Sequence, residues 1–204
     1  CHHRTDTIMD LSTGGDLTGI RRTIVSRSTV PVGTVPVYQA AVEAIEQHGG
    51  VVRMNPDRIF EIIEEHARDG VSFVTVHCGI NNRTIERLRH NPRKTMVVSR
   101  GGVFLLCWMI ANDRENPLFA QYDRLLEIAG KYDLILSLGD GMRPGSIADS
   151  TDHAQIEELL TLGELARAAR DKHVQVIIEG PGHIPLDEIV TNVQLEKKLC
   201  DGAP

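Results

Sequence analysis

The chain has 204 residues, of which 41% are apolar and 25% charged, and its formal net charge is −6. This composition is typical of a folded globular protein and excludes a disordered, collagen-like or coiled-coil chain. The sequence contains neither an apolar run of the ~20 residues that span a bilayer nor a basic stripe that would suit nucleic acid, so we expect a soluble, cytoplasmic protein with neither membrane nor nucleic acid as a partner.

The four cysteines are Cys1, Cys78, Cys107 and Cys200, and no two of them form a CxxC pair. Cysteines so far apart are typical of free thiols in a reducing compartment rather than of a disulfide framework. A chain of this length buries roughly 70% of the surface that its unfolded form exposes, so we expect its stability to come from an apolar core.

Six short apolar runs predict strands. In chain order they are residues 7–10, 33–38, 72–77, 96–99, 134–138 and 174–179. Because the apolar residues in these runs are continuous and do not alternate with polar ones, the runs are typical of parallel strands that are buried on both faces.

Amphipathic segments with recognisable ends lie between the predicted strands. The clearest one has an N-cap at Asn55 before Pro56, carries an apolar stripe, and ends at Gly70. A second helix is predicted to begin after Asp152, and a third covers residues 117–131. The histidines in or beside the helices are expected to face solvent, and they are His48, His66, His90, His153 and His173.

Alternating strands and helices predict an α/β fold with a parallel sheet. Each predicted strand is followed by a polar or glycine-rich segment, and in a (β/α)8 TIM-type barrel all such segments reach one shared mouth. An open doubly wound sheet would use mainly the segments at its switch point, and the sequence has no GxGxxG or GxxxxGK[ST] motif. We therefore predict a barrel.

The length allows only part of such a barrel. The five strand-to-strand steps from Ile8 to Val174 average about 33 residues, so eight units would need roughly 265 residues. We expect residues 1–204 to form a partial catalytic barrel of about six βα units that lacks a strand or more at each end.

Residues 179–183, Glu-Gly-Pro-Gly-His, are the most informative segment that follows a predicted strand. Their glycines and proline predict a sharp turn that places the Glu179 carboxylate beside the His183 imidazole. Histidine is the commonest metal ligand, and a neighbouring carboxylate can orient it or bind substrate. A turn whose histidine only caps a helix is an equally good interpretation, and a metal would need further ligands from outside this segment.

Two other segments suit a polar or phosphorylated ligand. In residues 139–145, Asp140 and Arg143 can present an acceptor and a donor fork, or can pair with each other in a tight turn. In residues 99–102, a hydroxyl, a guanidinium and the backbone N–H groups beside two glycines suit a phosphate, or serve only the turn.

Three further positions are ambiguous when the residues are considered alone. His77 at a strand end suits the barrel interior as well as it suits a ligand, and Met9 and Tyr38 are residue types more often found in a core. Residue chemistry and spacing thus predict a barrel-type site for a small, polar, phosphorylated ligand, with a metal near His183.

Five segments together resemble the phosphomethylpyrimidine synthase family, the radical S-adenosylmethionine enzymes of thiamine biosynthesis. The segments are residues 9–16, 32–40, 99–102, 137–145 and 178–185. The resemblance extends over essentially the whole chain, and the segments occur in the family's order.

This resemblance implies a lyase that converts 5-aminoimidazole ribotide into 4-amino-2-methyl-5-phosphomethylpyrimidine, which is hydroxymethylpyrimidine phosphate. It implies three cofactors: S-adenosylmethionine, a [4Fe–4S] cluster and zinc. The cluster would reduce S-adenosylmethionine, and this reduction would give a 5′-deoxyadenosyl radical. It further implies a homodimer and an external reductant for the cluster.

The family's motifs also imply functional residues. The substrate-binding residues would be Met9, Tyr38, His77, Ser99, Arg100, Gly101, Asp140, Gly141, Met142, Arg143 and Glu179, and Glu179 would also be catalytic. His183 would bind zinc together with a second histidine outside this chain. Met142 stands where the family usually has leucine, a change of similar volume at which we expect backbone contacts to substrate.

The sequence departs from the family at its ends. The cluster-binding CxxCxxxxC motif is absent, so we expect an N-terminal region and a C-terminal iron–sulfur region to lie outside this chain, and the segment alone to be inactive. Two alternatives stay open. One is the related 5-hydroxybenzimidazole synthase of anaerobic cobalamin biosynthesis, which starts from the same ribotide, and the other is a non-catalytic ribotide-binding remnant.

Overall fold

The computed structural model describes residues 4–204 and contains one parallel sheet. Its five strands are β1 (Ile8–Asp10), β2 (Val32–Thr34), β3 (Phe73–Val76), β4 (Ile135–Leu138) and β5 (Val176–Ile178). They lie side by side in chain order, and every neighbouring pair is parallel. The predicted α/β class is confirmed. The strand order never reverses within the described sheet, as expected for a sector of a (β/α) barrel and not for a doubly wound sheet.

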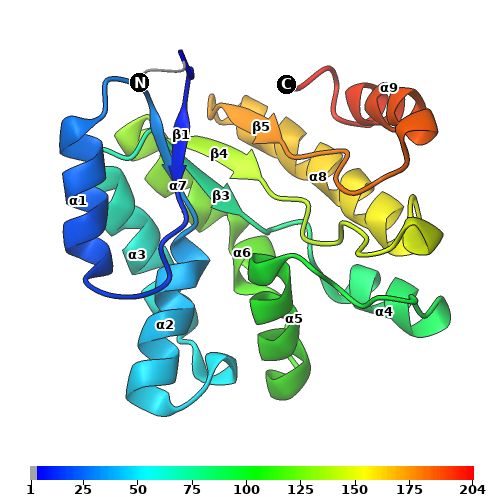
Figure 1. The fold of residues 1–204 in the computed structure, drawn as a ribbon, viewed down its shortest axis with the longest axis horizontal. Helices are drawn as coiled ribbons and strands as arrows, with labels where there is room; N and C mark the ends of the chain where they lie inside the picture. The colour runs from blue at the N-terminus through cyan, green and yellow to red at the C-terminus, as the bar shows by residue number, and fades with distance from the viewer. Residues whose placement is uncertain (1–3) are drawn as a thin grey trace.

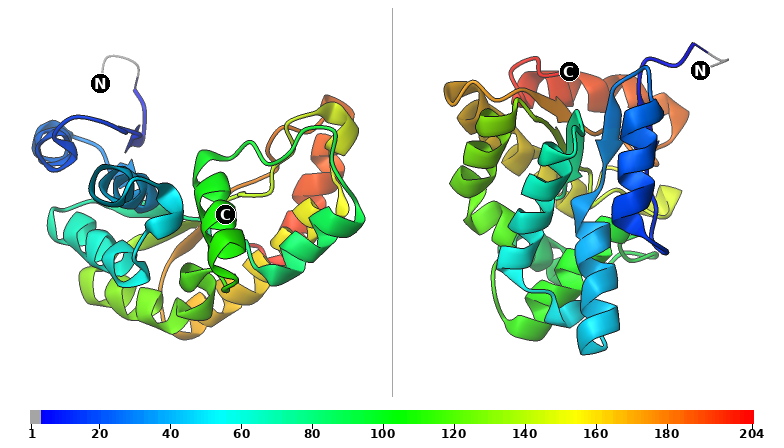
Figure 2. Two further views of the ribbon diagram at one scale, coloured as in Figure 1. Left: turned by 90° about the horizontal axis from the view of Figure 1, so that it is seen from below. Right: turned by 90° about the vertical axis from the view of Figure 1, so that its left-hand side faces the viewer.

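Helices connect the strands and flank the sheet (Figure 1). They are α1 (Leu17–Arg27), α2 (Pro36–His48), α3 (Pro56–Arg68), α4 (Asn82–His90), α5 (Arg100–Asn112), α6 (Pro117–Ala120), α7 (Tyr122–Tyr132), α8 (His153–Asp171) and α9 (Ile189–Leu199), with 3-10 turns at Val51–Arg53, Ile147–Asp149 and Leu186–Glu188. Seen from below, the chain follows a crescent from α1 to α9 (Figure 2). The described strands therefore form a curved, unclosed sheet, an arrangement consistent with the predicted partial barrel.

Helix α3 begins where its local sequence predicts. The Asn55 Oδ1 atom accepts a hydrogen bond from the Asp57 N–H at 3.0 Å, and Pro56 occupies the first helical position. The side chains of Ile59 and Ile63 are buried in the core. Each such burial contributes roughly 1.5–3 kcal/mol, so the apolar stripe fixes the orientation of the helix.

The two other predicted helices are present, one of them divided. Helix α8 begins after Asp152, whose carboxylate accepts a hydrogen bond from the Gln155 N–H at 2.9 Å. The helix predicted over residues 117–131 is broken at Gln121 into α6 and α7.

The strand predicted at residues 96–99 is wrong. These residues are irregular and lead into α5, and Met96 is 64% exposed. The backbone N–H groups of Lys94 and Thr95 donate to the Asp149 carboxylate, each at 2.8 Å, and not to a strand. A short apolar run does not by itself show whether a segment is a strand or another partly buried segment. The described residues consequently contain five strands, one fewer than the six predicted.

The strand predicted at residues 33–38 is too long. β2 ends at Thr34 and α2 begins at Pro36, so Tyr38 lies in the first turn of a helix. Proline is favoured at the first helical position because the N–H that it lacks would have no partner there. Tyr38 is thereby placed just beyond the carboxyl end of β2.

The centre of the sheet is buried, whereas its two outer strands are partly open. Val74, Leu136 and Leu138 have no exposed surface, which confirms the prediction of strands covered on both faces. In β1 and β5, by contrast, Met9 is 40% exposed and Ile177 is 37% exposed.

Two expectations from composition can be compared with the structure. Cys78, Cys107 and Cys200 are free thiols, and Cys1 lies outside the described residues. Within residues 4–204, the helices include none that combines the length and the apolar character needed to cross a bilayer.

Candidate functional site

The predicted site residues follow the strands and gather at one end of the sheet. His77 follows β3, Asp140 follows β4 and Glu179 follows β5. Parallel pairing of β3 with β4 and of β4 with β5 brings these three chain segments to the same edge. The carboxyl end of the strands is where barrel proteins place functional groups.

Glu179 is anchored by hydroxyl groups on two neighbouring strands. Its Oε1 atom accepts hydrogen bonds from Thr75 Oγ1 of β3 and from Ser137 Oγ of β4, each at 3.1 Å. These two donors fix the carboxyl group at the strand ends and leave its second oxygen, Oε2, for a ligand. The predicted substrate-binding and catalytic residue thus has a defined orientation.

His77 is buried beside Glu179 and is held in its neutral form. Burial lowers its pKa to about 4, against the opposing effect of the Glu179 charge. Its Nδ1 atom has no hydrogen-bond partner among residues 4–204. A Cβ on Gly101 would overlap the imidazole ring, so the first turn of α5 lies directly on it. Buried polar atoms nearly always have a hydrogen-bond partner, which makes this ring nitrogen a candidate contact for a substrate atom or a water molecule.

The loop after β4 contains the internal ion pair that the sequence left as one alternative. Arg143 Nη1 donates to Asp140 Oδ1 at 2.8 Å. Burial raises the pKa of Asp140 to about 6, and the Arg143 charge opposes that rise. The Arg143 guanidinium keeps other N–H groups that this bond does not use. The ion pair therefore orients both side chains without exhausting their capacity for a ligand.

The loop after β5 packs tightly on the loop after β4. A Cβ on Gly182 would overlap Asp140 Oδ2 and would lie 3.2 Å from Arg143 Cδ. Glycine at position 182 thus leaves room for the Asp140 and Arg143 side chains where the two loops meet. Two segments that are about 40 residues apart in the sequence meet at one place.

Ser99 caps α5 and supplies a candidate anion site. Its Oγ atom accepts a hydrogen bond from the Gly102 N–H at 3.2 Å. The first N–H groups of a helix have no partner within the helix, and together with the helix dipole they favour an anion. The Arg100 guanidinium lies 5.2 Å from the centre of the Tyr38 ring, which links this turn to α2.

Met9 and Met142 differ in their placement. Met9 is partly exposed in β1 at the open edge of the sheet. Met142 is fully buried, and its backbone N–H and C=O are bonded to Glu158 Oε2 and Arg93 Nη2, at 2.7 and 2.6 Å. Both backbone groups of Met142 are therefore already engaged inside the protein.

His183 is oriented as a metal ligand would be, but it is alone. Its Nδ1 atom lies 3.0 Å from the Pro144 carbonyl oxygen, to which it can donate, so that Nε2 is the nitrogen free to bind a metal. The part of the chain that the structure describes has no group of three His, Cys, Asp or Glu side chains able to hold a metal ion. These residues fit one ligand of a zinc site and not a complete site.

Sequence reasoning missed several buried polar residues around this site. Asn116 Nδ2 donates to the carbonyl oxygens of His77 and Ile80, at 2.9 and 2.8 Å. Glu158 and Arg93 hold the loop after β4. Glu158 could have been noticed because it interrupts an apolar helical face, four residues before Leu162, whereas Asn116 and Arg93 give no such signal.

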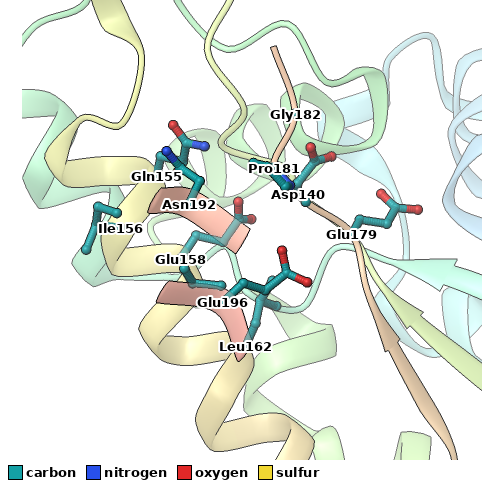
Figure 3. Close-up of a pocket in the computed structure, with 12 residues that line it drawn as sticks. Asp140, Gln155, Ile156, Glu158, Leu162, Glu179, Pro181, Gly182, Asn192 and Glu196 are labelled. Atoms are coloured by element: carbon teal, nitrogen blue, oxygen red, sulfur yellow. The ribbon is translucent and has the colours of Figure 1, made fainter. Parts of the chain in front are cut away.

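Behind the loop after β4 lies a small cavity of about 30 Å³ that is rich in carboxyl groups. Asp140, Glu158, Glu179 and Glu196 all line it, and they come from α8, α9 and the two loops (Figure 3). This volume is enough for a water molecule.

A parallel sheet in barrel order, with ionisable and anion-binding groups at the carboxyl ends of its strands, is typical of the (β/α)-barrel enzymes. The chain belongs to the Radical SAM ThiC family, whose model matches residues 1–204. The resemblance drawn from five short segments is thereby confirmed.

Individual relatives agree with the family match. The chain is 58% identical to the phosphomethylpyrimidine synthases of Caldanaerobacter subterraneus subsp. tengcongensis and Desulforudis audaxviator, over 98% of this chain and 46% of each relative. It is 55% identical to the phosphomethylpyrimidine synthase of Thermodesulfovibrio yellowstonii, over 98% of this chain and 47% of the relative. The chain thus spans about half the length of the curated relatives that it matches.

Proposed function

We propose that this chain forms the substrate-binding part of a phosphomethylpyrimidine synthase, which converts 5-aminoimidazole ribotide into hydroxymethylpyrimidine phosphate. The observation that carries the proposal is the convergence of Ser99–Gly101, Asp140–Arg143 and Glu179 around the buried His77 ring. Every relative named above carries the name of this enzyme.

The phosphate of the ribotide would bind at the start of α5. The N–H groups of Arg100 and Gly101, the Ser99 hydroxyl and the Arg100 guanidinium together offer the donors that a phosphate dianion needs. Because Arg100 also lies over the Tyr38 ring, its charge is held between the starts of α5 and α2.

The sugar and the aminoimidazole ring would lie toward β4 and β5. Arg143 and Asp140 offer a donor and an acceptor from one rigid loop. Glu179 Oε2 can accept from a hydroxyl or an amine, and it can take up a proton released from the substrate. Neutral His77 can accept or donate a hydrogen bond at Nδ1 without adding charge.

The radical chemistry would come from S-adenosylmethionine and a [4Fe–4S] cluster, as is general in radical SAM families, and the cluster would need an external reductant. The described residues would bind and orient the ribotide. Glu179 would take up a proton from it, and neutral His77 would form a hydrogen bond to it. His183 would contribute one zinc ligand, and a second histidine would come from outside this chain.

We further propose that the described strands are part of a larger barrel in a homodimeric, cytoplasmic lyase. The Ile178 N–H of β5 donates to the Pro204 carbonyl oxygen at 2.8 Å, so the last residue of the chain already lies along the open edge of β5. The partial exposure of Met9 and Ile177 on the outer strands is what further strands would cover.

The direct test is an anaerobic assay of the protein made from its complete gene, with 5-aminoimidazole ribotide, S-adenosylmethionine and a chemical reductant. Formation of hydroxymethylpyrimidine phosphate, identified by mass spectrometry, supports the proposal. Formation of 5-hydroxybenzimidazole would instead identify the protein as a 5-hydroxybenzimidazole synthase and contradict the proposed product. Binding of the ribotide without any product would identify a binding protein and contradict the proposed enzyme.

A further inference from the structure

Glu158 of α8 is a buried carboxyl group for which the assigned site has no role. It is 2% exposed. Two glycines make room for it: a Cβ on Gly79 would lie 2.8 Å from Glu158 Cγ, and a Cβ on Gly141 would lie 3.1 Å from Glu158 Oε1. A Cβ would come still closer to Leu162 at position 79, at 2.6 Å, and to Ile80 at position 141, so both glycines make room for Glu158 together with an apolar neighbour.

Glu158 holds the backbone of the loop formed by residues 140–143. Its Oε2 atom accepts a hydrogen bond from the Met142 N–H at 2.7 Å. The Met142 carbonyl oxygen is bound by Arg93 Nη2 at 2.6 Å, and Arg93 in turn forms a two-bond ion pair with Asp152, the N-cap of α8. Both polar backbone groups at the centre of the loop are thus tied to the start of one helix.

The other oxygen of Glu158 faces a different environment. Oε1 is buried and has no hydrogen-bond partner in residues 4–204. It belongs to a side chain that lines the cavity shared with Glu179 and Glu196 (Figure 3). Burial raises the pKa of Glu158 well above its usual range, and the nearby Asp140 charge adds to that rise. A protonated Oε1 is therefore an unused donor on a side chain that lines a space able to hold water.

Charge explains why a neutral acid suits this position. The loop presents Asp140 and Arg143 to a ligand that carries phosphate under the proposed function. An ionised Glu158 would add a second negative charge near Asp140. A protonated Glu158 holds the same backbone N–H and adds no charge.

We propose that Glu158 is a positioning residue of the loop formed by residues 140–143, acting as a neutral carboxylic acid that binds the Met142 N–H through Oε2 and donates Oε1–H into the cavity. It sets where Asp140 and Arg143 meet the ligand without touching the ligand itself. The ligand's identity rests on the proposed function, whereas the contact between Glu158 and the loop does not.

Two substitutions in the protein made from its complete gene separate this role from general stability. In Glu158→Gln, the amide oxygen accepts from the Met142 N–H and the amide NH2 replaces the acid proton. In Glu158→Leu, the volume is similar but the Met142 N–H loses its acceptor. We expect Glu158→Leu to weaken 5-aminoimidazole ribotide binding on the order of tenfold and Glu158→Gln to stay within about twofold.

Two spectroscopic measurements test the contact directly. Hydrogen exchange at the Met142 amide should remain slow in Glu158→Gln and become fast in Glu158→Leu. The infrared band of a protonated carboxyl group should disappear in Glu158→Gln. Glu164→Gln and Glu164→Leu, on the exposed face of the same helix, are the matched controls and should change neither signal.

Each outcome has a definite meaning. If Glu158→Leu keeps both the slow exchange and the ribotide affinity, Glu158 does not position the loop. If the infrared band persists in Glu158→Gln, the neutral acid lies elsewhere and that part of the proposal is wrong. If the unmodified protein does not bind the ribotide, the proposed function fails, and the exchange and infrared measurements still decide the role of Glu158.

Discussion

Gly102 in the first turn of α5 lies directly against Gly141 in the loop after β4. A Cβ on Gly102 would stand 2.6 Å from the Gly141 carbonyl oxygen, an atom of the main chain that cannot rotate away. This contact joins the candidate phosphate-binding turn to the loop that contains Asp140 and Arg143. The close approach of these two parts of the site therefore depends on the absence of a side chain at Gly102.

Replacing Gly102 with alanine should push these segments apart. Overpacking of this kind costs about 1–3 kcal/mol, and here it also displaces α5 from the loop. We expect Gly102→Ala to lower the free energy of unfolding in urea and to weaken ribotide binding. Gly130→Ala in α7 is the control, since a Cβ there meets nothing within 4 Å and alanine should stabilise the helix by roughly 0.5–1 kcal/mol. Equal stability and affinity in Gly102→Ala and the parent protein would contradict this explanation.

Glu179→Gln should remove turnover and preserve the fold. The amide oxygen of glutamine can still accept hydrogen bonds from Thr75 and Ser137, so the strand ends keep their contacts. The change removes the negative charge and the ability to take up a proton, and loss of a general base typically costs about 10²–10⁴-fold in rate. Thermal unfolding and anaerobic product formation should be measured on the same protein preparation. Product formation at the parental rate would exclude Glu179 as a catalytic residue.

His66 should make the protein sensitive to acid. It is buried, accepts a hydrogen bond from Thr34 Oγ1 at 2.8 Å, and lies with Nε2 3.0 Å from the Gln39 Oε1 atom, to which it donates. Burial lowers its pKa to about 3, and the nearby Arg21 charge acts in the same direction. The unfolded chain binds a proton near pH 6.5, whereas the folded protein does not until about pH 3. Stability is therefore fully present above pH 6.5 and is lost as the pH falls toward 3.

Urea unfolding across this pH range measures the effect. The parent protein should lose up to about 4 kcal/mol more than His66→Gln between pH 6.5 and 3. His66→Gln has a lower stability at neutral pH because its hydrogen bonds change, so the slope against pH is the criterion and not the absolute value. His90→Gln, at an exposed position in α4, should keep the parental slope. The same slope in all three proteins would show that His66 does not control acid stability.

Local sequence predicted the helices better than it predicted the strands. The ends of α3 depend on Asn55 and Pro56, which act within one turn, and the start of α8 depends on Asp152 in the same way. A strand needs a partner, and residues 96–99 have none because the backbone before them is bound by Asp149, more than 50 residues further along the chain. No local pattern contains that information.

The sequence motifs predicted the site residues, but they did not predict the buried polar residues that pack around them. Glu179, Asp140 and His77 are marked by glycine-rich segments after strands, so their shared location follows from parallel topology. His66 was expected to face solvent and is buried, because Thr34 and Gln39 cover its helix from distant parts of the chain. Glu158 was missed because glutamate is rarely buried, and because its packing against Gly79 and Gly141 joins segments that are distant in the sequence.

His183 provides the last test, which concerns zinc. Its backbone has a φ of 58°, a conformation that asparagine tolerates better than most residues, so His183→Asn removes the imidazole with little added strain. Because Nδ1 faces the Pro144 carbonyl and Nε2 is left for a metal, we expect His183→Asn in the protein made from its complete gene to lose bound zinc, as determined by metal analysis after dialysis. His173→Asn is the matched control, since His173 also has a positive φ, of 59°, and lies just after the C-terminal end of α8, outside the candidate site. Full zinc occupancy in His183→Asn would remove His183 from the ligand set, whereas equal loss in both variants would show that zinc depends on stability and not on this imidazole.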